Sequence, residues 1–270
     1  MPKESTKNGP IDPDLQWTDD EIVMSDMTPD TDFVFERMTV ETIEAVDAKP
    51  GELVLDVACG RAIDALKIAE AGADLVGIEA SDTMIEKALE FIGEDRSKVR
   101  MVRSLAEDLP FADETFDKVV CKGAMDHFAN IEDCMAEMGR VTKQNGKVII
   151  AIANFESLTC RLGRAISPIK EFFTGRGPGD HPFWEPPLDH NYKFDMDVLV
   201  TLMRRHCVIY DVRGISMMWG YPGWGGFMRK LPKGVSAGIL KGLDKTAHVF
   251  PTLSDVLVAV GKPIKIGDDS

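Results

Sequence analysis

Short apolar runs alternate with amphipathic stretches through most of the chain. Runs rich in Val, Ile and Leu are typical of strands buried on both faces, and apolar residues at i, i+3 and i+4 are typical of helices. These patterns predict strands at 53–58, 75–78, 99–102, 116–121, 147–153, 207–212 and 256–260. They predict helices at 32–46, 62–71, 83–91, 131–142 and 196–205.

Alternating strands and helices predict an α/β fold with a doubly wound, mostly parallel, seven-stranded sheet and helices on both faces. Residues 1–16 are polar and carry no periodicity, so we predict a flexible tail followed by one domain, 17–270. Thr18 and Glu21 have the spacing of a helix capping box, and residues 17–50 are predicted to form a helical cap.

Two segments interrupt the alternation. Residues 155–194 are rich in Gly, Pro and aromatic residues, which predicts an irregular lid or binding loop. Residues 215–249 combine aromatics and methionines with an amphipathic stretch at 235–249. Basic residues accompany this second segment, so it either contacts an anionic lipid surface or covers the sheet. They are Arg229, Lys230, Lys233, Lys241 and Lys245.

Composition narrows the function classes. The net charge of −14 argues against nucleic acid as a partner, because phosphate binding requires a basic face. No apolar run is long enough to span a membrane and the first ten residues are polar, so we expect a cytoplasmic protein. Five widely spaced cysteines indicate reduced thiols.

The sequence contains only a weak indication of a metal site. Asp180-His181 and Asp189-His190 are two acid–histidine pairs in one loop, but no Cys/His cluster with a typical zinc spacing accompanies them. We therefore predict no metal.

The segment Val54–Asp64 carries the clearest chemistry. It is an apolar strand that ends in a turn of small residues and then opens a helix, which lets a ligand approach backbone N–H groups. Glu79 follows 19 residues after Gly60, at the end of the next strand, where a carboxylate can bind both hydroxyls of a ribose. These features fit either an adenosine or a dinucleotide ligand.

Three segments together resemble the class I S-adenosylmethionine-dependent methyltransferases, specifically the type 11 group. The first is the turn with Asp56, Ala58, Gly60 and Ala62, with alanine where the family often has glycine. The second runs from Ala106 to Asp117 and the third from Met135 to Gly146. The resemblance covers residues 50–153 and implies a Rossmann-like fold with S-adenosylmethionine as cofactor and S-adenosylhomocysteine as product.

The resemblance also implies roles for single residues. The turn holds the methionine end of the cofactor, Glu79 the ribose, and Ala106 the adenine through its backbone. Leu105 stands where the family often has an acid, and either Glu107 or a backbone carbonyl can substitute for it. The full predicted set is Asp56, Ala58, Cys59, Gly60, Ala62, Glu79, Ala80, Ser81, Met84, Leu105, Ala106, Glu107, Cys121 and Lys122.

Two residues after the fourth strand are candidate catalytic residues. Lys122 either pairs with the carboxylate of the cofactor or acceptor, or points to solvent. His127 either takes a proton from a hydroxyl or amine of the acceptor, or serves as a packing or capping residue. An in-line methyl transfer depends mainly on alignment and exclusion of water, so no strong base is required.

The two interrupting segments predict an acceptor pocket. Aromatic and histidine side chains in them suit a small acceptor that is apolar, lipid-like or aromatic. These residues are His181, Trp184, His190, Tyr192, Trp219 and Tyr221.

Two other functions compete with methyl transfer. A catalytically inactive regulatory or scaffold protein that binds the same cofactor would explain Leu105, Lys122 and the alanine-substituted turn. A nucleotide-dependent oxidoreductase is disfavoured because residues 58–62 lack the G-x-G-x-x-G spacing of dinucleotide sites.

Overall fold

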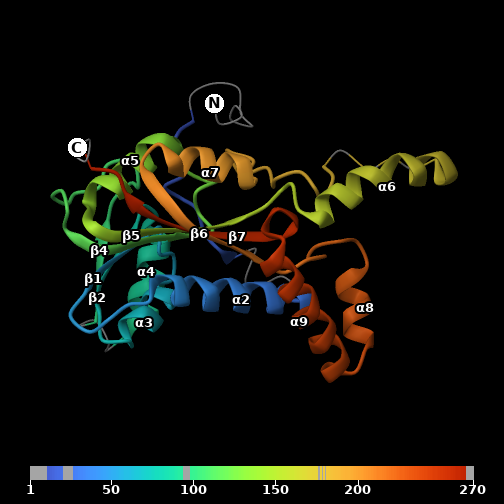
Figure 1. Ribbon diagram of the computed structural model, residues 1–270, viewed down its shortest axis with the longest axis horizontal. Coiled ribbons are helices and arrows are strands. Elements are labelled where there is room, and N and C mark those ends of the chain that lie inside the picture. The colour runs from blue at the N-terminus through green and yellow to red at the C-terminus, as the bar shows by residue number, and fades with distance from the viewer. Residues whose placement is uncertain are drawn as a thin grey trace.

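A seven-stranded sheet forms the centre of the protein (Figure 1). The computed structural model describes residues 11–20, 27–93, 98–175, 177, 179 and 181–265. The strand order is β3-β2-β1-β4-β5-β7-β6, and β7 runs antiparallel to both β5 and β6. The strands are β1 (Leu53–Val57), β2 (Asp74–Glu79), β3 (Val99–Arg103), β4 (Phe116–Lys122), β5 (Thr142–Ala153), β6 (Cys207–Ile215) and β7 (Val256–Pro263).

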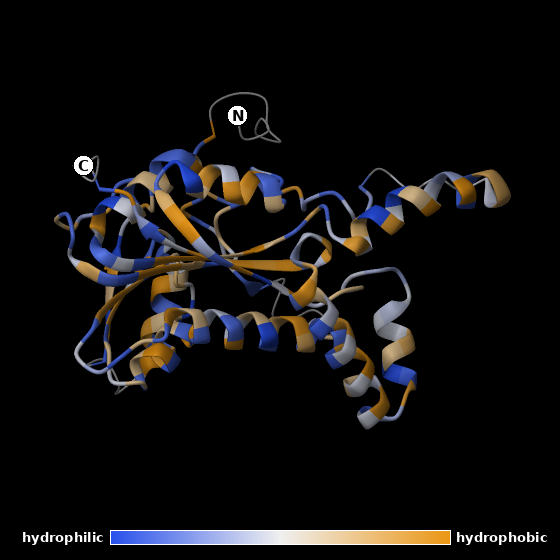
Figure 2. Ribbon diagram, viewed as in Figure 1, coloured by the Kyte–Doolittle hydropathy of each residue, from blue (hydrophilic) through white to orange (hydrophobic). Residues whose placement is uncertain are grey.

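Helices cover both faces of this sheet (Figure 1). One apolar core joins α5 and α7 to the sheet, and a second joins α2, α3 and α4 to the opposite face. In Figure 2 the central parts of the strands between them are mainly apolar. The helices are α2 (Pro29–Val46), α3 (Ile63–Ala69), α4 (Asp82–Ile92), α5 (Ile131–Val141), α6 (Leu158–Thr174), α7 (Met196–Arg204), α8 (Trp224–Lys230) and α9 (Lys233–Val249).

The predicted fold class is confirmed, and each predicted strand is present. Predicted and observed starts differ most at β5, which begins at Thr142 instead of Lys147 because the strand pairs with β4 again at Phe116 after a register shift. All five cysteines are free thiols. Most of the helix predicted to follow Thr18 falls on residues 21–26, which lie outside the described part of the chain.

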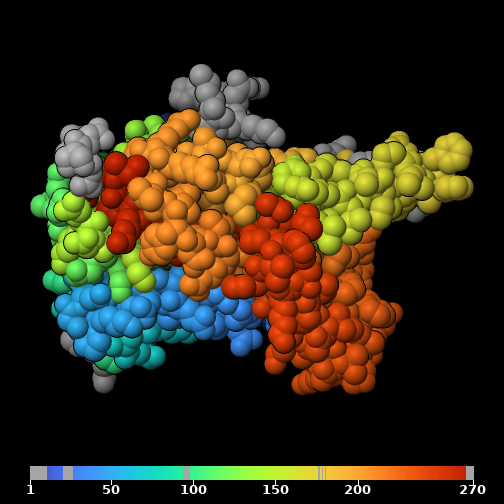
Figure 3. Space-filling model, viewed as in Figure 1, coloured from blue at the N-terminus to red at the C-terminus, as the bar shows by residue number. Residues whose placement is uncertain are grey.

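The segment 155–194 contains more regular structure than predicted. Helix α6 occupies 17 of its residues, and Ser157 caps it by accepting a hydrogen bond from the backbone N–H of Cys160. The Gly- and Pro-rich part begins only after this helix, so an irregular loop throughout the segment was the wrong prediction. Figure 3 shows α6, in yellow, projecting beyond the body of the protein. Asp180, one member of a predicted acid–histidine pair, lies outside the described residues.

Two long-range contacts fix the positions of the interrupting segments. Asp255, at the start of β7, accepts hydrogen bonds from Thr159 Oγ1 (2.6 Å) and from the backbone N–H of Trp219 (2.9 Å). Thr159 belongs to α6 and Trp219 to the second segment, so one buried carboxyl group joins both segments to the sheet.

Candidate cofactor and acceptor site

The turn between β1 and α3 has an unusual backbone. Ala58, Gly60 and Ala62 have φ values of 57°, 53° and 59°, all in the left-handed region. A Cβ built on Gly60 would meet only Met84 Cε, at 3.6 Å, so it is the backbone conformation that favours glycine there. The two alanines adopt this conformation against their steric preference. The turn brings successive backbone N–H groups to the carboxyl edge of the sheet.

Glu79 closes the turn from the neighbouring strand. Its side chain is buried and accepts hydrogen bonds from the backbone N–H groups of Gly60 (3.1 Å), Ala80 (2.8 Å) and Ser81 (3.0 Å). Strands β1 and β2 are parallel and adjacent, with Val57 opposite Ile78, so their ends meet at one edge. The carboxylate predicted to bind the ribose is thus held rigidly beside the turn.

A cavity of about 360 Å³ opens at this edge. Its volume lies within the range of small-molecule sites in proteins. Ten of the fourteen residues predicted to bind the cofactor line it: Ala58, Cys59, Gly60, Glu79, Ala80, Met84, Leu105, Ala106, Glu107 and Lys122. The other four, Asp56, Ala62, Ser81 and Cys121, lie behind its wall and are buried.

Carboxylates outnumber basic side chains around the cavity. Burial, with further contributions from Asp64 and Glu79, raises the pKa of Asp56 to about 8, although nearby Lys122 acts in the opposite sense. The lining carboxylates are Asp14, Asp19, Asp64, Glu79 and Glu107, and the basic side chains are Arg61, Lys67 and Lys122. This balance suits a cationic ligand such as a sulfonium better than the pyrophosphate of a dinucleotide.

Lys122 points into the cavity wall. Its Nζ lies 2.5 Å from Asp64 Oδ2 and donates a hydrogen bond to Thr39 Oγ1 (3.0 Å). The alternative in which this side chain points to solvent is therefore wrong. Thr39 and Asp64 were not predicted from the sequence, because α2 and α3 bring them to the strand end from different parts of the chain.

Glu107 is engaged by the loop after β4. Its Oε1 accepts hydrogen bonds from the backbone N–H groups of Ala129 (2.9 Å) and Asn130 (3.2 Å). The side chain therefore ties two walls of the cavity together. Its predicted role as a replacement for the acid missing at Leu105 remains a prediction.

The N-terminal segment forms a further wall, part of which lies in the predicted helical cap and part in the predicted flexible tail. Pro13, Asp14, Trp17 and Asp19 all line the cavity, so part of the predicted flexible tail is packed against the site. Asp19 binds Arg61 through two contacts of 2.5 and 2.9 Å and also pairs with Lys87 (3.2 Å). In the sequence, only Arg61 in the predicted turn indicated that an acidic residue such as Asp19 would pack there.

His127 also lines the cavity. Burial is the main cause that lowers its pKa, and neighbouring His190 adds to this, whereas Asp126, Asp189 and Asp14 oppose it. The pKa of His190 is raised because its contact with Asp126 outweighs burial. The pKa values of the two imidazoles thus shift in opposite directions.

The residues predicted for the acceptor pocket do not line this cavity. Trp184 and Tyr221 both pack on Phe183, Trp219 packs on Phe35 of α2, and the hydroxyl of Tyr192 donates to the carbonyl oxygen of Ala129. His190 lies behind His127, with the ring centroids 4.5 Å apart. His181, the remaining member, is exposed on the surface.

Comparison with known proteins agrees with this geometry. Residues 55–150 match the family described as methyltransferase domain. A demethylmenaquinone methyltransferase from Thermobifida fusca is 36% identical over 110 residues, 40% of this chain and 47% of that protein. A ubiquinone biosynthesis O-methyltransferase from Rickettsia akari is 27% identical over 139 residues, 52% of this chain and 51% of that protein.

The fold also matches solved structures. The YcgJ protein from Bacillus subtilis superposes with a TM-score of 0.55 over 86% of this chain and 100% of that one, at 17% identity. The present chain spans about half the length of the curated relatives it matches. The matched segment contains the left-handed turn, Glu79 and His127, and so most of the cavity. Residues 55–150 of this chain therefore match a methyltransferase domain, and the sheet around them has the fold of solved methyltransferase structures.

Proposed function

We propose that this protein transfers a methyl group from S-adenosylmethionine to a small, apolar or quinone-like acceptor. The observation that carries the proposal is a single cavity in which the left-handed turn and Glu79 meet an apolar wall. That wall includes Trp17, Ile63 and Phe128. Glu79 suits the ribose of the donor, and the apolar side chains suit a planar or lipid-like acceptor.

The acceptor class is supported by two of the relatives. Both are named for quinones, demethylmenaquinone in one case and ubiquinone in the other. The N-terminal segment lines one side of the cavity, and an in-line displacement at a sulfonium carbon depends on alignment and exclusion of water. None of the comparisons favours the catalytically inactive alternative.

In this proposal Lys122 and His127 have different roles. Lys122 is paired with Asp64 and hydrogen-bonded to Thr39, so it positions the cavity wall beside the donor. His127 meets the acceptor and can act on its hydroxyl in two ways: by taking the proton, or by holding a cation that lowers the pKa of the hydroxyl. Asp126 and His190, which lie behind His127, favour the second role, in which His127 holds a cation.

Contact with a lipid surface is also part of the proposal. Among the described residues, no helix is both long and apolar enough to cross a membrane. On α8, on α9 and directly after α9, however, large apolar side chains are at least half exposed, and α9 also carries exposed Lys241 and Lys245. They are Phe227, Val235, Val249 and Phe250. Binding to anionic but not zwitterionic vesicles, reduced by Lys241→Glu with Lys245→Glu, is expected in a sedimentation assay.

Calorimetric titration of the purified chain tests the cofactor. We expect saturable binding of S-adenosylmethionine and S-adenosylhomocysteine, with NAD bound more weakly or not at all. Glu79→Gln should weaken binding by at least about 10-fold, because a hydrogen bond to a charged group contributes about 1.5–3 kcal/mol. Glu36→Ala, which removes an exposed carboxylate on α2, is the matched control.

Turnover is then measured with a labelled methyl donor and a panel of hydroquinones and phenols. Label transferred to one of these acceptors, and lost in Glu79→Gln, is the expected result. Preferential binding of NAD would overturn the proposal. Tight binding of the adenosyl ligands without transfer to any acceptor would favour the inactive alternative.

A further inference from the structure

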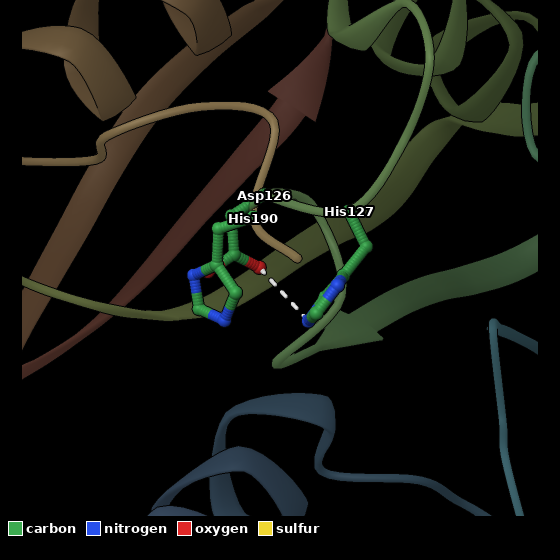
Figure 4. A group of neighbouring side chains, drawn as sticks. All are labelled: Asp126, His127 and His190. Carbon is green, nitrogen blue, oxygen red and sulfur yellow. Dashed lines mark ion pairs between the residues drawn. The ribbon is translucent and has the colours of Figure 1, made fainter. Parts of the chain in front are cut away.

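A cluster of two histidines and one carboxylate lies directly behind the cavity wall. Asp126 and His127 belong to the loop after β4, and His190 lies at the end of the segment 155–194 (Figure 4). We propose that these three side chains bind one divalent transition-metal ion at the acceptor end of the cavity. The binding site stands on its own geometry, and its use in holding the acceptor rests on the proposed function.

The spacing of the ligand atoms fits an ion. One ligand atom from each of the three residues can be chosen so that all lie within 4.8 Å of one another. Asp126 Oδ1 and His127 Nε2 are 4.0 Å apart, which is too long for a hydrogen bond (Figure 4). Ligands at about 2.0–2.2 Å from one zinc-like ion lie about 3–4 Å from each other. A small inward shift of these side chains would therefore bring all three ligand atoms to bonding distance from one ion.

Asp126 supplies an independent reason to expect a cation. Its side chain is 3% exposed, and Oδ2 lies 2.7 Å from His190 Nδ1. Oδ1 is fully buried and has no hydrogen-bond partner among the described residues. A buried carboxylate oxygen without a partner is costly, because it has lost water without gaining a donor. An ion between Oδ1 and His127 removes that cost.

The backbone around the cluster is already fixed. The carbonyl oxygen of Asp126 accepts hydrogen bonds from the backbone N–H groups of Asn191 (2.7 Å) and Tyr192 (3.2 Å). The side-chain amide of Asn191 donates to the carbonyl oxygens of His127 (2.6 Å) and Phe128 (3.2 Å). These bonds hold the two loops together, so His190 stays next to Asp126 without an ion.

The outer surroundings of His127 also resemble those of a metal-binding imidazole. Asp189 Oδ2 lies 3.7 Å from His127 Nδ1, on the opposite side of the ring from Asp126. Such a carboxylate typically orients a metal-bound histidine and strengthens it as a ligand. Both ring nitrogens of His127 thus have a carboxylate close by.

The donor set indicates the class of ion and of acceptor. Two imidazoles and one carboxylate suit Zn²⁺, Fe²⁺, Co²⁺ or Mn²⁺, whereas Mg²⁺ and Ca²⁺ prefer oxygen ligands alone. Three protein ligands leave at least one coordination position open. His127 borders the cavity whereas Asp126 and His190 do not, so that position is reached from the cavity side. The ligand expected there is an oxygen of a phenol, hydroquinone or enol, whose pKa the ion lowers.

Metal titration of the full chain tests the site directly. After removal of metals with a chelator, calorimetry with ZnCl₂, MnCl₂ and CoCl₂ should show one ion bound per chain for at least one metal. Visible absorption of the Co²⁺ form should report nitrogen and oxygen coordination. Asp126→Asn and His190→Gln should each weaken binding at least about 10-fold, as loss of a supporting group alone commonly does. His248→Gln removes an exposed histidine on α9 and is the matched control.

Binding of S-adenosylhomocysteine to the same samples separates this proposal from the proposed function. Variants that keep this binding and the wild-type melting temperature are folded, so weaker metal binding in them supports the site. The proposal is overturned if no metal binds saturably, or if the affinity is unchanged in both variants. A chain that binds S-adenosylhomocysteine but no metal leaves the methyltransferase proposal intact.

Discussion

Trp17 packs against His127, with the ring centroids 5.8 Å apart and the ring planes inclined at 59°. The two residues are separated by 110 positions in the sequence, and both line the cavity. The N-terminal segment therefore lies against the proposed acceptor side of the site. This contact links the least patterned part of the chain to its proposed catalytic residue.

Trp17→Ala should impair acceptor binding more than donor binding. An aromatic contact contributes about 0.5–1.5 kcal/mol beyond the area it buries. The KM for a hydroquinone acceptor should therefore rise several-fold. Calorimetry should show little change in the affinity for S-adenosylhomocysteine. Trp224→Ala, on α8, removes a similar side chain outside the cavity and should leave both values near wild type.

Asp19→Asn should loosen the N-terminal segment. Asp19 pairs with Arg61 and Lys87, and partly exposed pairs of this kind contribute at most about 1 kcal/mol each. We expect faster proteolysis within residues 11–20 and a few-fold weaker binding of S-adenosylmethionine. Asp82→Asn breaks the exposed pair with Arg103 and serves as control. Equal proteolysis in Asp19→Asn and wild type would show that the Asp19 ion pairs do not hold the N-terminal segment in place.

Binding of S-adenosylmethionine should depend on pH through Asp56. Burial raises the pKa of Asp56 to about 8, so this carboxyl group is mostly protonated at neutral pH. A bound sulfonium favours the charged carboxylate and lowers its pKa, so binding releases a proton below pH 8. Affinity should therefore rise with pH, by at most about 10-fold per unit, and level off above pH 8.

Calorimetry in buffers of different ionisation enthalpy measures the proton released. Asp56→Asn should lose the part of the release that comes from this residue, while any contribution from the ligand's own amino group stays. If wild type and Asp56→Asn release the same number of protons, the protonation state of Asp56 does not change when the ligand binds.

Asp255 should make the stability of the fold depend on pH. Burial is the main cause that raises its pKa from 3.8 to about 7, although hydrogen bonds from Thr159 and the Trp219 N–H oppose the shift. The folded protein thus binds this proton more tightly than the unfolded chain. The associated stability is present below pH 4 and is lost as pH rises towards 7, by up to about 4 kcal/mol.

Asp255→Asn isolates this effect. The difference in the free energy of unfolding between Asp255→Asn and wild type should shift in favour of the variant as pH rises from 4 to 7. Urea titrations at several pH values give this difference directly. Asp82→Asn, at a side chain that is 63% exposed, should show a difference that stays constant over the same range.

The parts of the site that lie close together in sequence were predictable. The left-handed turn and Glu79 come from adjacent parallel strands, whose carboxyl ends must meet at one edge. Ten of the predicted cofactor residues consequently line the cavity. On the acceptor side, the predicted Trp184, Trp219 and Tyr221 pack on other aromatic rings and do not line this cavity, so their place in an acceptor pocket stays a prediction.

The contact between Asp126 and His190 could not be predicted. Each residue stands beside another acid or histidine in the sequence, but 64 positions separate them. Hydrogen bonds from the backbone N–H groups of Asn191 and Tyr192 to the Asp126 carbonyl bring them together. No periodic pattern encodes such a contact, because it depends on where two loops cross.

The sequence alone determined the order of the seven strands along the chain, the turn after β1 and the position of Glu79 at the end of β2. These depend on apolar periodicity and on local turn chemistry, which act between near neighbours. Only the tertiary structure decided that residues 11–20 cover the cavity, that Asp255 ties both interrupting segments to the sheet, and that two histidines converge on Asp126. These features rest on ion pairs and hydrogen bonds between distant segments, whose free energy exists only after the sheet has brought those segments together.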